Sequence, residues 1–186
     1  MDVFTAADAF DGEACRWIQA AMDNGVREPA SVLRDSVDVE VETRRASDIE
    51  VGDDVIEYVE CRLDAYRDAI GAFYGMRLRG REGSGFLRYE SGGFYGPHVD
   101  RTDVPSWPDA AQRAITMVVF LNSSSVVDAD GEFTGGCLRL FPRGFDAPSI
   151  DIPARRGTLV AFPSSIPHEV TMVDRGRRDT IVDWCY

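Results

Sequence analysis

Residues 157–173 read Gly-Thr-Leu-Val-Ala-Phe-Pro-Ser-Ser-Ile-Pro-His-Glu-Val-Thr-Met-Val. Two short apolar runs, Thr158–Phe162 and His168–Val173, flank a break rich in proline and serine. Apolar runs of this length between turn-forming residues predict β-strands rather than helices. This stretch therefore shows the pattern on which the fold of the C-terminal half depends.

The same pattern recurs along the whole region that follows Gly75. The strand candidates are Gly85–Glu90, Phe94–Asp100, Ala114–Leu121, Cys137–Phe141, Ser149–Ile152, Thr158–Phe162, His168–Val173 and Thr180–Trp184. Many short strands with almost no helical periodicity between them are typical of an antiparallel sandwich or barrel. We expect an eight-stranded jelly roll, the double-stranded β-helix.

The region before Gly75 has a different spacing of apolar residues. Apolar residues recur every three or four positions in residues 11–24 and 53–74, which predicts two helices, the second of five to six turns. Valines alternate with acidic residues over Val37–Glu42, which predicts a short strand. The predicted fold class is thus mainly β with N-terminal helices, a jelly roll supported by a long α-helix.

The chain shows no internal repeat, low-complexity linker or shift of composition that would mark a domain boundary. A length of 186 residues suits one domain. We therefore expect a single domain over residues 1–186. Within it, residues 1–75 form a helical support region with a short strand, and residues 76–186 form the jelly-roll catalytic core.

Composition excludes several classes of function. Acidic residues outnumber basic ones 32 to 20, and this net charge of −12 disfavours binding to nucleic acid. Every basic residue is arginine, so mechanisms that need a lysine amine are excluded, including a Walker A phosphate loop and a pyridoxal Schiff base. No signal peptide and no membrane-spanning run is evident, so we expect a soluble cytoplasmic protein.

The chain contains only two histidines, His98 and His168. His98 is followed two residues later by Asp100, and on a strand residues i and i+2 project to the same face. His168 opens another predicted strand 70 residues further on. Two neutral imidazoles and one carboxylate with open coordination positions are typical of non-haem Fe(II) oxygenases. Zinc sites also use three protein ligands and a water, so the triad alone leaves both metals open.

An arginine pair, Arg177 and Arg178, precedes the last predicted strand. An oxygenase that uses an organic acid must hold the far carboxylate of that acid, and a guanidinium binds a carboxylate bidentately without losing its charge. Arg178 shares its strand face with Thr180, Val182 and Trp184, which is the more apolar set. We therefore expect Arg178 to point inward and Arg177 to face solvent.

Several ordered blocks between residues 84 and 186 resemble the 2-oxoglutarate- and Fe(II)-dependent dioxygenases of the prolyl 4-hydroxylase group, and most of all the hypoxia-factor prolyl hydroxylases. The blocks are Phe86–Tyr89, Gly92–Asp100, Arg113–Thr116 with Phe120–Asn122, Gly135–Pro142, and Gly157–Phe162 with Pro167–Val170, Arg178 and Trp184. The N-terminal helices fit the supporting helices of that family but are less diagnostic.

The resemblance implies that His98, Asp100 and His168 bind Fe(II) and that Arg178 holds the distal carboxylate of the cosubstrate 2-oxoglutarate. It implies O2 as the second cosubstrate and ascorbate as the reductant. Residues expected to line the cosubstrate pocket are Tyr89, which can hydrogen-bond to it, and the apolar residues Val118, Leu138 and Val170. Related halogenases lack the carboxylate ligand, so its presence favours hydroxylation.

Three other positions carry expectations from the same resemblance. Close relatives have a tyrosine where this chain has Phe120, so the missing hydroxyl leaves Arg178 as the main cosubstrate anchor. Arg44 and Arg45 lie near the segment that relatives use to enclose peptide substrates. Trp107 follows the first metal-binding strand and is a candidate substrate lid or loop anchor.

Three functions follow from these patterns. The first is hydroxylation of prolyl residues in a protein or peptide, with decarboxylation of 2-oxoglutarate to succinate. The second is the same chemistry on a free amino acid or small metabolite, because the chain carries no separate substrate-binding domain. The third is a jelly-roll metal-binding module, or a zinc hydrolase, without oxygenase activity.

Overall fold

The computed structural model describes residues 2–33, 37–38, 43–103, 108–127 and 132–186. The helices are α1 (Gly12–Asn24), α2 (Asp53–Tyr74) and α3 (Pro108–Gln112). The strands are β1 (Phe4–Ala6), β2 (Arg27–Pro29), β3 (Val32–Leu33), β4 (Val37–Asp38), β5 (Arg44–Arg45), β6 (Ser47–Ile49), β7 (Gly85–Glu90), β8 (Phe94–His98), β9 (Ile115–Phe120), β10 (Phe133–Gly135), β11 (Leu138–Leu140), β12 (Ile150–Ile152), β13 (Leu159–Pro163), β14 (His168–Val170) and β15 (Val173–Cys185).

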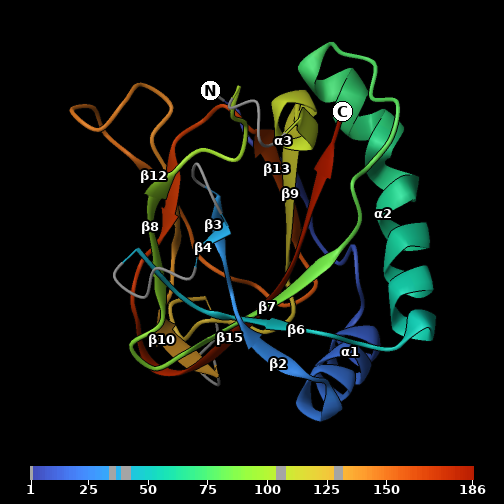
Figure 1. The fold of residues 1–186 in the computed structure, drawn as a ribbon, viewed down its shortest axis with the longest axis vertical. Helices are drawn as coiled ribbons and strands as arrows, with labels where there is room; N and C mark the ends of the chain where they lie inside the picture. Colours follow the sequence, from blue (N-terminus) through green and yellow to red (C-terminus); the bar gives the residue numbers. More distant parts are fainter. Residues whose placement is uncertain (1, 34–36, 39–42, 104–107, 128–131) are drawn as a thin grey trace.

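Two antiparallel sheets form the body of the molecule (Figure 1). The larger, eight-stranded sheet has the order β1-β13-β9-β15-β7-β6-β2, and β10 pairs with β15 beside this path. The smaller, five-stranded sheet has the order β12-β11-β14-β8-β5. Within the part of the chain that the structure describes, strands β3 and β4 pair only with each other. This arrangement is the double-stranded β-helix, so the predicted fold class is confirmed.

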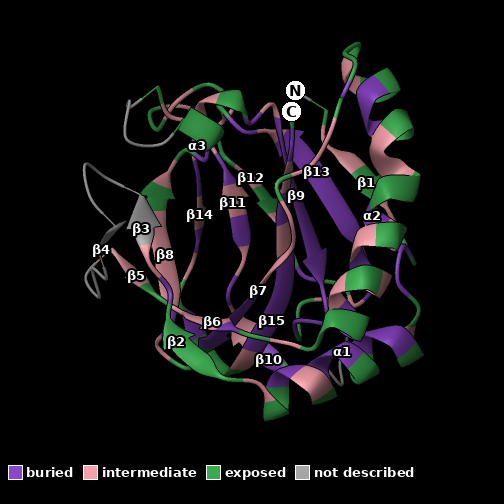
Figure 2. Cartoon of the chain, turned by 45° about the vertical axis from the view of Figure 1, so that its right-hand side comes forward, coloured by how far each residue is buried: buried purple, intermediate pink, exposed green. Residues whose placement is uncertain are grey.

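The two long helices cover the outer face of the large sheet (Figures 1 and 2). The Asp11 carboxylate caps α1 by accepting hydrogen bonds from the backbone N–H groups of Glu13 and Ala14 at 3.0 and 2.8 Å. Helix α2 ends at Gly75, whose left-handed φ of 66° suits glycine at this position. Both predicted helices are therefore confirmed, and no helix of the described residues is long and apolar enough to cross a bilayer.

The core has two parts because β9 is buried on both faces. On one face Ile115, Met117 and Val119 pack with the apolar residues of α1 and α2. On the other face Val118 and Phe120 join residues of the small sheet in a second cluster between the sheets. The second cluster surrounds the site described below, and the first holds the large sheet against the helices.

The N-terminal region contributes more strands than the sequence predicted. Strand β1 pairs with β13, β2 and β6 extend the large sheet beyond β7, and β5 pairs with β8. Strands of two or three residues carry too few positions to show a period, so they could not be read from the sequence. Of the predicted strand Val37–Glu42, only Val37–Asp38 lies within the described residues.

The C-terminal strand boundaries also differ from the prediction. The run His168–Val173 is divided, because β14 ends at Val170 and β15 begins at Val173. Strand β15 then continues for 13 residues, starting seven positions before the predicted strand at Thr180. The backbone of Gly176, Arg177 and Arg178, just ahead of the predicted strand at Thr180, also pairs with β10 and β7 and lies within the sheet.

Candidate metal and cosubstrate site

Pairing of β8 with β14 places His98 directly opposite His168 in the small sheet. Asp100 follows β8, where its backbone N–H donates to the carbonyl of Ser164 at 3.1 Å. The Nε2 atoms of His98 and His168 lie 3.4 and 3.5 Å from the Asp100 carboxylate. One ligand atom from each of the three residues lies within 4.8 Å of the others, so these side chains can hold one metal ion.

Backbone carbonyls fix the orientation of both imidazoles. Nδ1 of His98 lies 2.9 Å from the carbonyl of Gly96, and Nδ1 of His168 lies 3.0 Å from the carbonyl of Ile166. A carbonyl only accepts hydrogen bonds, so each Nδ1 must carry the proton. In its neutral form each ring therefore presents the lone pair of Nε2 toward Asp100, as a metal ligand does.

The charge states of the triad suit a cation. Burial lowers the pKa of His168 to about 4, against the opposing effect of Asp100, so this imidazole is neutral at neutral pH. Burial alone would raise the pKa of Asp100, but the neighbouring rings of His168 and His98 hold it below its usual range. Asp100 is thus an ionised, buried carboxylate beside two nitrogen lone pairs, the donor set of a divalent transition metal.

A hydroxyl pair supports the carboxylate from the large sheet. Thr116 of β9 donates from Oγ1 to Oδ2 of Asp100 at 2.7 Å. The Oγ1 atom of Thr116 also lies 3.0 Å from the Ser164 hydroxyl. Arg113 donates to the Asp100 carbonyl at 3.2 Å. These contacts leave Oδ1 of Asp100 directed toward His98, so the large sheet orients a ligand that belongs to the small one.

Arg178 lies deeper in the same pocket, with only 1% of its surface exposed. Its guanidinium carbon lies 5.1 Å from the centre of the Tyr89 ring and 5.4 Å from that of Phe120. Its Nε has no hydrogen-bond partner among the described residues. A buried guanidinium with an unsatisfied N–H is costly, and the carboxylate of an organic acid would satisfy it.

All eight predicted site residues line one pocket of about 360 Å³. They are Tyr89, His98, Asp100, Val118, Leu138, His168, Val170 and Arg178. Arg177 is not among the lining residues, because its side chain is 38% exposed and pairs with Asp23 at 2.6 Å on the outside of the sheet. The pocket thus brings the triad and the buried arginine together, while the ligand roles assigned to them stay predictions.

A second group of pocket residues includes Arg44, which the sequence resemblance placed near a substrate-enclosing segment, and Asp48, which sequence reasoning missed. Arg44 of β5 lies opposite Tyr95 of β8, with its guanidinium carbon 4.6 Å from the Tyr95 ring centre. That ring stacks on His98 with centroids 3.5 Å apart. Asp48 of β6 lines the same pocket. No periodic signal could have found Arg44 or Asp48, because their strands are two and three residues long.

Two other positions singled out from the sequence have different outcomes. Trp107 lies outside the described residues. Phe120 belongs to the second core cluster beside Arg178, and Nη1 of that arginine lies 3.4 Å from Thr180 Oγ1. Thr116 could have been found by its strand parity, because it lies two residues before Val118 and therefore shares the inward face of β9 with it.

The model of the 2OG-Fe(II) oxygenase superfamily matches residues 84–186, more than half of the chain, and the chain belongs to this superfamily. Its triad and buried arginine fit that assignment in number, type and position. The membership of the 2-oxoglutarate- and Fe(II)-dependent oxygenases expected from the sequence motifs is thereby confirmed.

Among curated proteins, the chain is similar to PKHD-type hydroxylases. It is 32% identical over 101 residues to one from Alteromonas mediterranea and 34% identical over 101 residues to one from Shewanella frigidimarina. Each match covers 53% of this chain and 41% of the relative, so it spans less than half the length of these relatives.

Solved structures of prolyl hydroxylases resemble nearly the whole chain. A prolyl-4-hydroxylase from Pseudomonas putida superposes with a TM-score of 0.74 and 26% identity, covering 98% of this chain and 91% of the other. A prolyl hydroxylase from Trichoplax adhaerens, solved with a hypoxia-inducible-factor peptide, gives a TM-score of 0.77 at 21% identity over 99% and 83%. The likeness to the hypoxia-factor enzymes is therefore one of fold.

Proposed function

We propose that this protein hydroxylates prolyl residues in a protein or peptide, using Fe(II), O2 and 2-oxoglutarate, which is converted to succinate. The observation that carries the proposal is the pocket in which the His98, Asp100 and His168 side chains share one cavity with a buried arginine whose Nε has no partner among the described residues. The likeness to the Pseudomonas putida prolyl-4-hydroxylase over 98% of this chain supports the prolyl substrate.

In this proposal His98, Asp100 and His168 hold the iron through Nε2, a carboxylate oxygen and Nε2. Bound iron and 2-oxoglutarate together supply oxidative decarboxylation of the acid, coupled to insertion of an oxygen atom from O2 into a C–H bond. Thr116 keeps the Asp100 carboxylate oriented toward the metal position by its 2.7 Å hydrogen bond. The apolar side chains of Val118, Leu138 and Val170 are expected to exclude water from the cosubstrate.

Arg178 is proposed to bind the distal carboxylate of 2-oxoglutarate. Its guanidinium is a buried cation among the pocket-lining side chains; burial lowers the pKa of this arginine, and a guanidinium keeps its charge at neutral pH. A charged group that is desolvated in the free protein gains most from an oppositely charged ligand. The same cost disfavours apolar 2-oxo acids, which leave the guanidinium unpaired.

A second candidate substrate is a free amino acid. The observation that favours it is that the pocket is lined by a further cation and anion, Arg44 and Asp48, in addition to Asp100, Arg113 and Arg178. A zwitterion could pair its carboxylate with Arg44 and its ammonium with Asp48. A prolyl residue inside a peptide has neither charge, so the two substrates differ in their dependence on this pair.

The test is succinate formation from 2-oxoglutarate by protein loaded with Fe(II), in the presence of ascorbate. Arg178→Ala should lose turnover at low 2-oxoglutarate, whereas its neighbour Arg177→Ala, which lies outside the pocket, should keep it. Equal activity of both variants would contradict the assignment of the anchor. Incubation with host lysate and a search for +16 mass shifts then separates prolyl peptides from small metabolites.

A further inference from the structure

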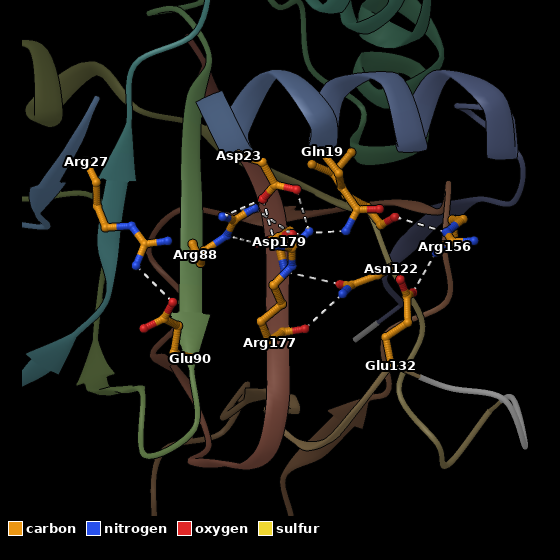
Figure 3. Close-up of polar contacts among 11 residues, drawn as sticks. Gln19, Asp23, Arg27, Arg88, Glu90, Asn122, Glu132, Arg156, Arg177 and Asp179 are labelled. Carbon is orange, nitrogen blue, oxygen red and sulfur yellow. Dashed lines mark hydrogen bonds and ion pairs between the residues drawn. The ribbon is translucent and has the colours of Figure 1, made fainter. Parts of the chain in front are cut away.

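The side chain of Asn122 lies beside β15 at the point where the ladder between β9 and β15 ends. The last residue pair is Phe120 with Thr180, followed by a backbone bond from Leu121 N–H to the Asp179 carbonyl at 3.0 Å. Beyond it, Asn122 Nδ2 donates to the Arg177 carbonyl at 2.8 Å, and Asn122 Oδ1 accepts from the Asp179 N–H at 3.1 Å (Figure 3). The carboxamide thus takes the place of a peptide group of a neighbouring strand.

The residue between these two hydrogen bonds is Arg178. On its other edge the backbone of Arg178 pairs with Tyr89 of β7. Asn122 is 1% exposed, so both bonds are made away from competing water. The backbone that carries the arginine is therefore held from both sides, by a strand on one edge and by a single side chain on the other.

The guanidinium itself has little polar support. Its Nη1 lies 3.4 Å from Thr180 Oγ1, which is a long contact, and its Nε has no partner among the described residues. The direction of the side chain consequently depends on its backbone and on packing against Tyr89 and Phe120.

We propose that Asn122 is a positioning residue for the cosubstrate: by holding the peptide groups on both sides of Arg178, it aims the guanidinium at the distal carboxylate of 2-oxoglutarate. This inference rests on the role of Arg178 given under Proposed function. A loss of either hydrogen bond lets the strand edge shift, and a bidentate contact depends on small displacements.

The ion-pair network on the outer face of β15 provides a matched control. Gln19 of α1 donates to Asp179 Oδ2 at 3.0 Å, and Arg88 donates to Oδ1 at 2.7 Å (Figure 3). Both bonds end on the Asp179 carboxylate and neither contacts the peptide groups beside Arg178. Gln19→Ala therefore removes one buried hydrogen bond from the same neighbourhood while leaving the proposed hold intact.

The experiment measures binding to the Mn(II)-loaded protein by calorimetry, with two acids as probes. One is 2-oxoglutarate and the other is 2-oxopentanoate, which has the same chain length but ends in a methyl group. For Asn122→Ala we expect Kd for 2-oxoglutarate to rise about 10-fold, the effect of losing one to two net hydrogen bonds, with Kd for 2-oxopentanoate within about twofold of wild type. In turnover, KM for 2-oxoglutarate should rise while kcat changes little.

The other variants complete the test. Asn122→Asp keeps the acceptor for the Asp179 N–H and loses the donor, so its Kd should lie between those of wild type and Asn122→Ala; it decides the question if the alanine variant does not fold. Gln19→Ala should lower Tm and leave the preference for 2-oxoglutarate unchanged.

Two results would overturn the inference: a folded Asn122 variant with wild-type preference, or an equal loss of affinity for both acids. Wild-type protein without preference for 2-oxoglutarate would instead refute the proposed role of Arg178 itself, so the two failures can be told apart.

Discussion

The two sheets of this protein differ in how they are supported, and the candidate site draws on both. The large sheet is buried on both faces at β9, where it lies between the helices and the pocket. The small sheet alternates: β11 and β14 bury their inward residues and turn Arg139 and Glu169 outward, where Arg139 pairs with Asp151 and Glu169. His98 and His168 lie on the small sheet, whose outer face carries exposed side chains. Arg178 lies on the large sheet, whose outer face is covered by helices.

This difference in support matches a difference in what each sheet has to position. Metal ligands are drawn together by the ion they bind, so the small sheet needs only to bring two histidines into register. In the proposed function the Arg178 guanidinium must meet a free organic acid without such help, and its strand is held by helices, β7 and Asn122. Variants on the two sheets should therefore fail in different ways.

The largest effect is expected from removing a ligand on the small sheet. His168→Ala should abolish stoichiometric metal binding and reduce succinate formation by more than about 100-fold, because loss of a ligand exceeds the usual effect of losing its supporting contacts. Metal content and turnover measure this directly. The variant should keep the circular dichroism of the wild type, and a variant that retains bound iron would contradict the ligand assignment.

On the large sheet the largest effect is expected on stability. Asp179→Ala leaves the buried Arg88 guanidinium without the carboxylate that accepts from its Nε at 2.7 Å. Breaking a buried pair from one side costs about 3–5 kcal/mol of the free energy of unfolding. Denaturant unfolding measures this loss. A cost below about 1 kcal/mol would mean that the network under α1 does not support the sheet.

A contact that joins the two sheets should have an intermediate effect. Thr116→Val removes the hydroxyl that donates to Asp100 at 2.7 Å and leaves the volume almost unchanged. Metal affinity should fall by about 10- to 100-fold, the usual range for losing the hydrogen bond behind a ligand. Titration of the apoprotein with Mn(II) tests it, and Thr116→Ser, which restores a hydroxyl, should recover most of the affinity.

The smallest effect is expected on the outer face of the small sheet. Arg139→Ala breaks exposed pairs with Asp151 and Glu169 at 2.7 and 3.2 Å, and such surface pairs contribute less than about 1 kcal/mol. Unfolding of this variant, measured beside Asp179→Ala, compares the outer faces of the two sheets. If both variants lost a similar free energy of unfolding, the inferred difference in support between the outer faces of the two sheets would be wrong.

The site was more predictable from sequence than the strands that complete it. His98 and Asp100 were found because a strand repeats every two residues, and the same parity separated Arg178 from Arg177. Both long helices were found from their apolar stripes. These signals are local, so a single sequence contains them in full.

The resemblance placed Arg44 near the substrate, but its contacts in the pocket, and the contributions of β6 and Asn122, could not be predicted because they depend on distant partners. Arg44 is brought to the pocket by the pairing of β5 with β8. Its partner in that pairing, Tyr95, lies 51 positions further along the chain. Asn122 acts on peptide groups 55 and 57 positions away. Such contacts arise from topology, and neither residue type nor spacing indicates them.

The carbonyls of Gly96 and Ile166 have one more consequence. Because each lies two residues before the histidine that it contacts, the proton on Nδ1 is settled by the local chain of that histidine. Both rings are then already in the tautomer that metal binding requires. None of the free energy of metal binding is needed to change the tautomer. Association with metal should therefore need no transfer of the imidazole proton from one ring nitrogen to the other.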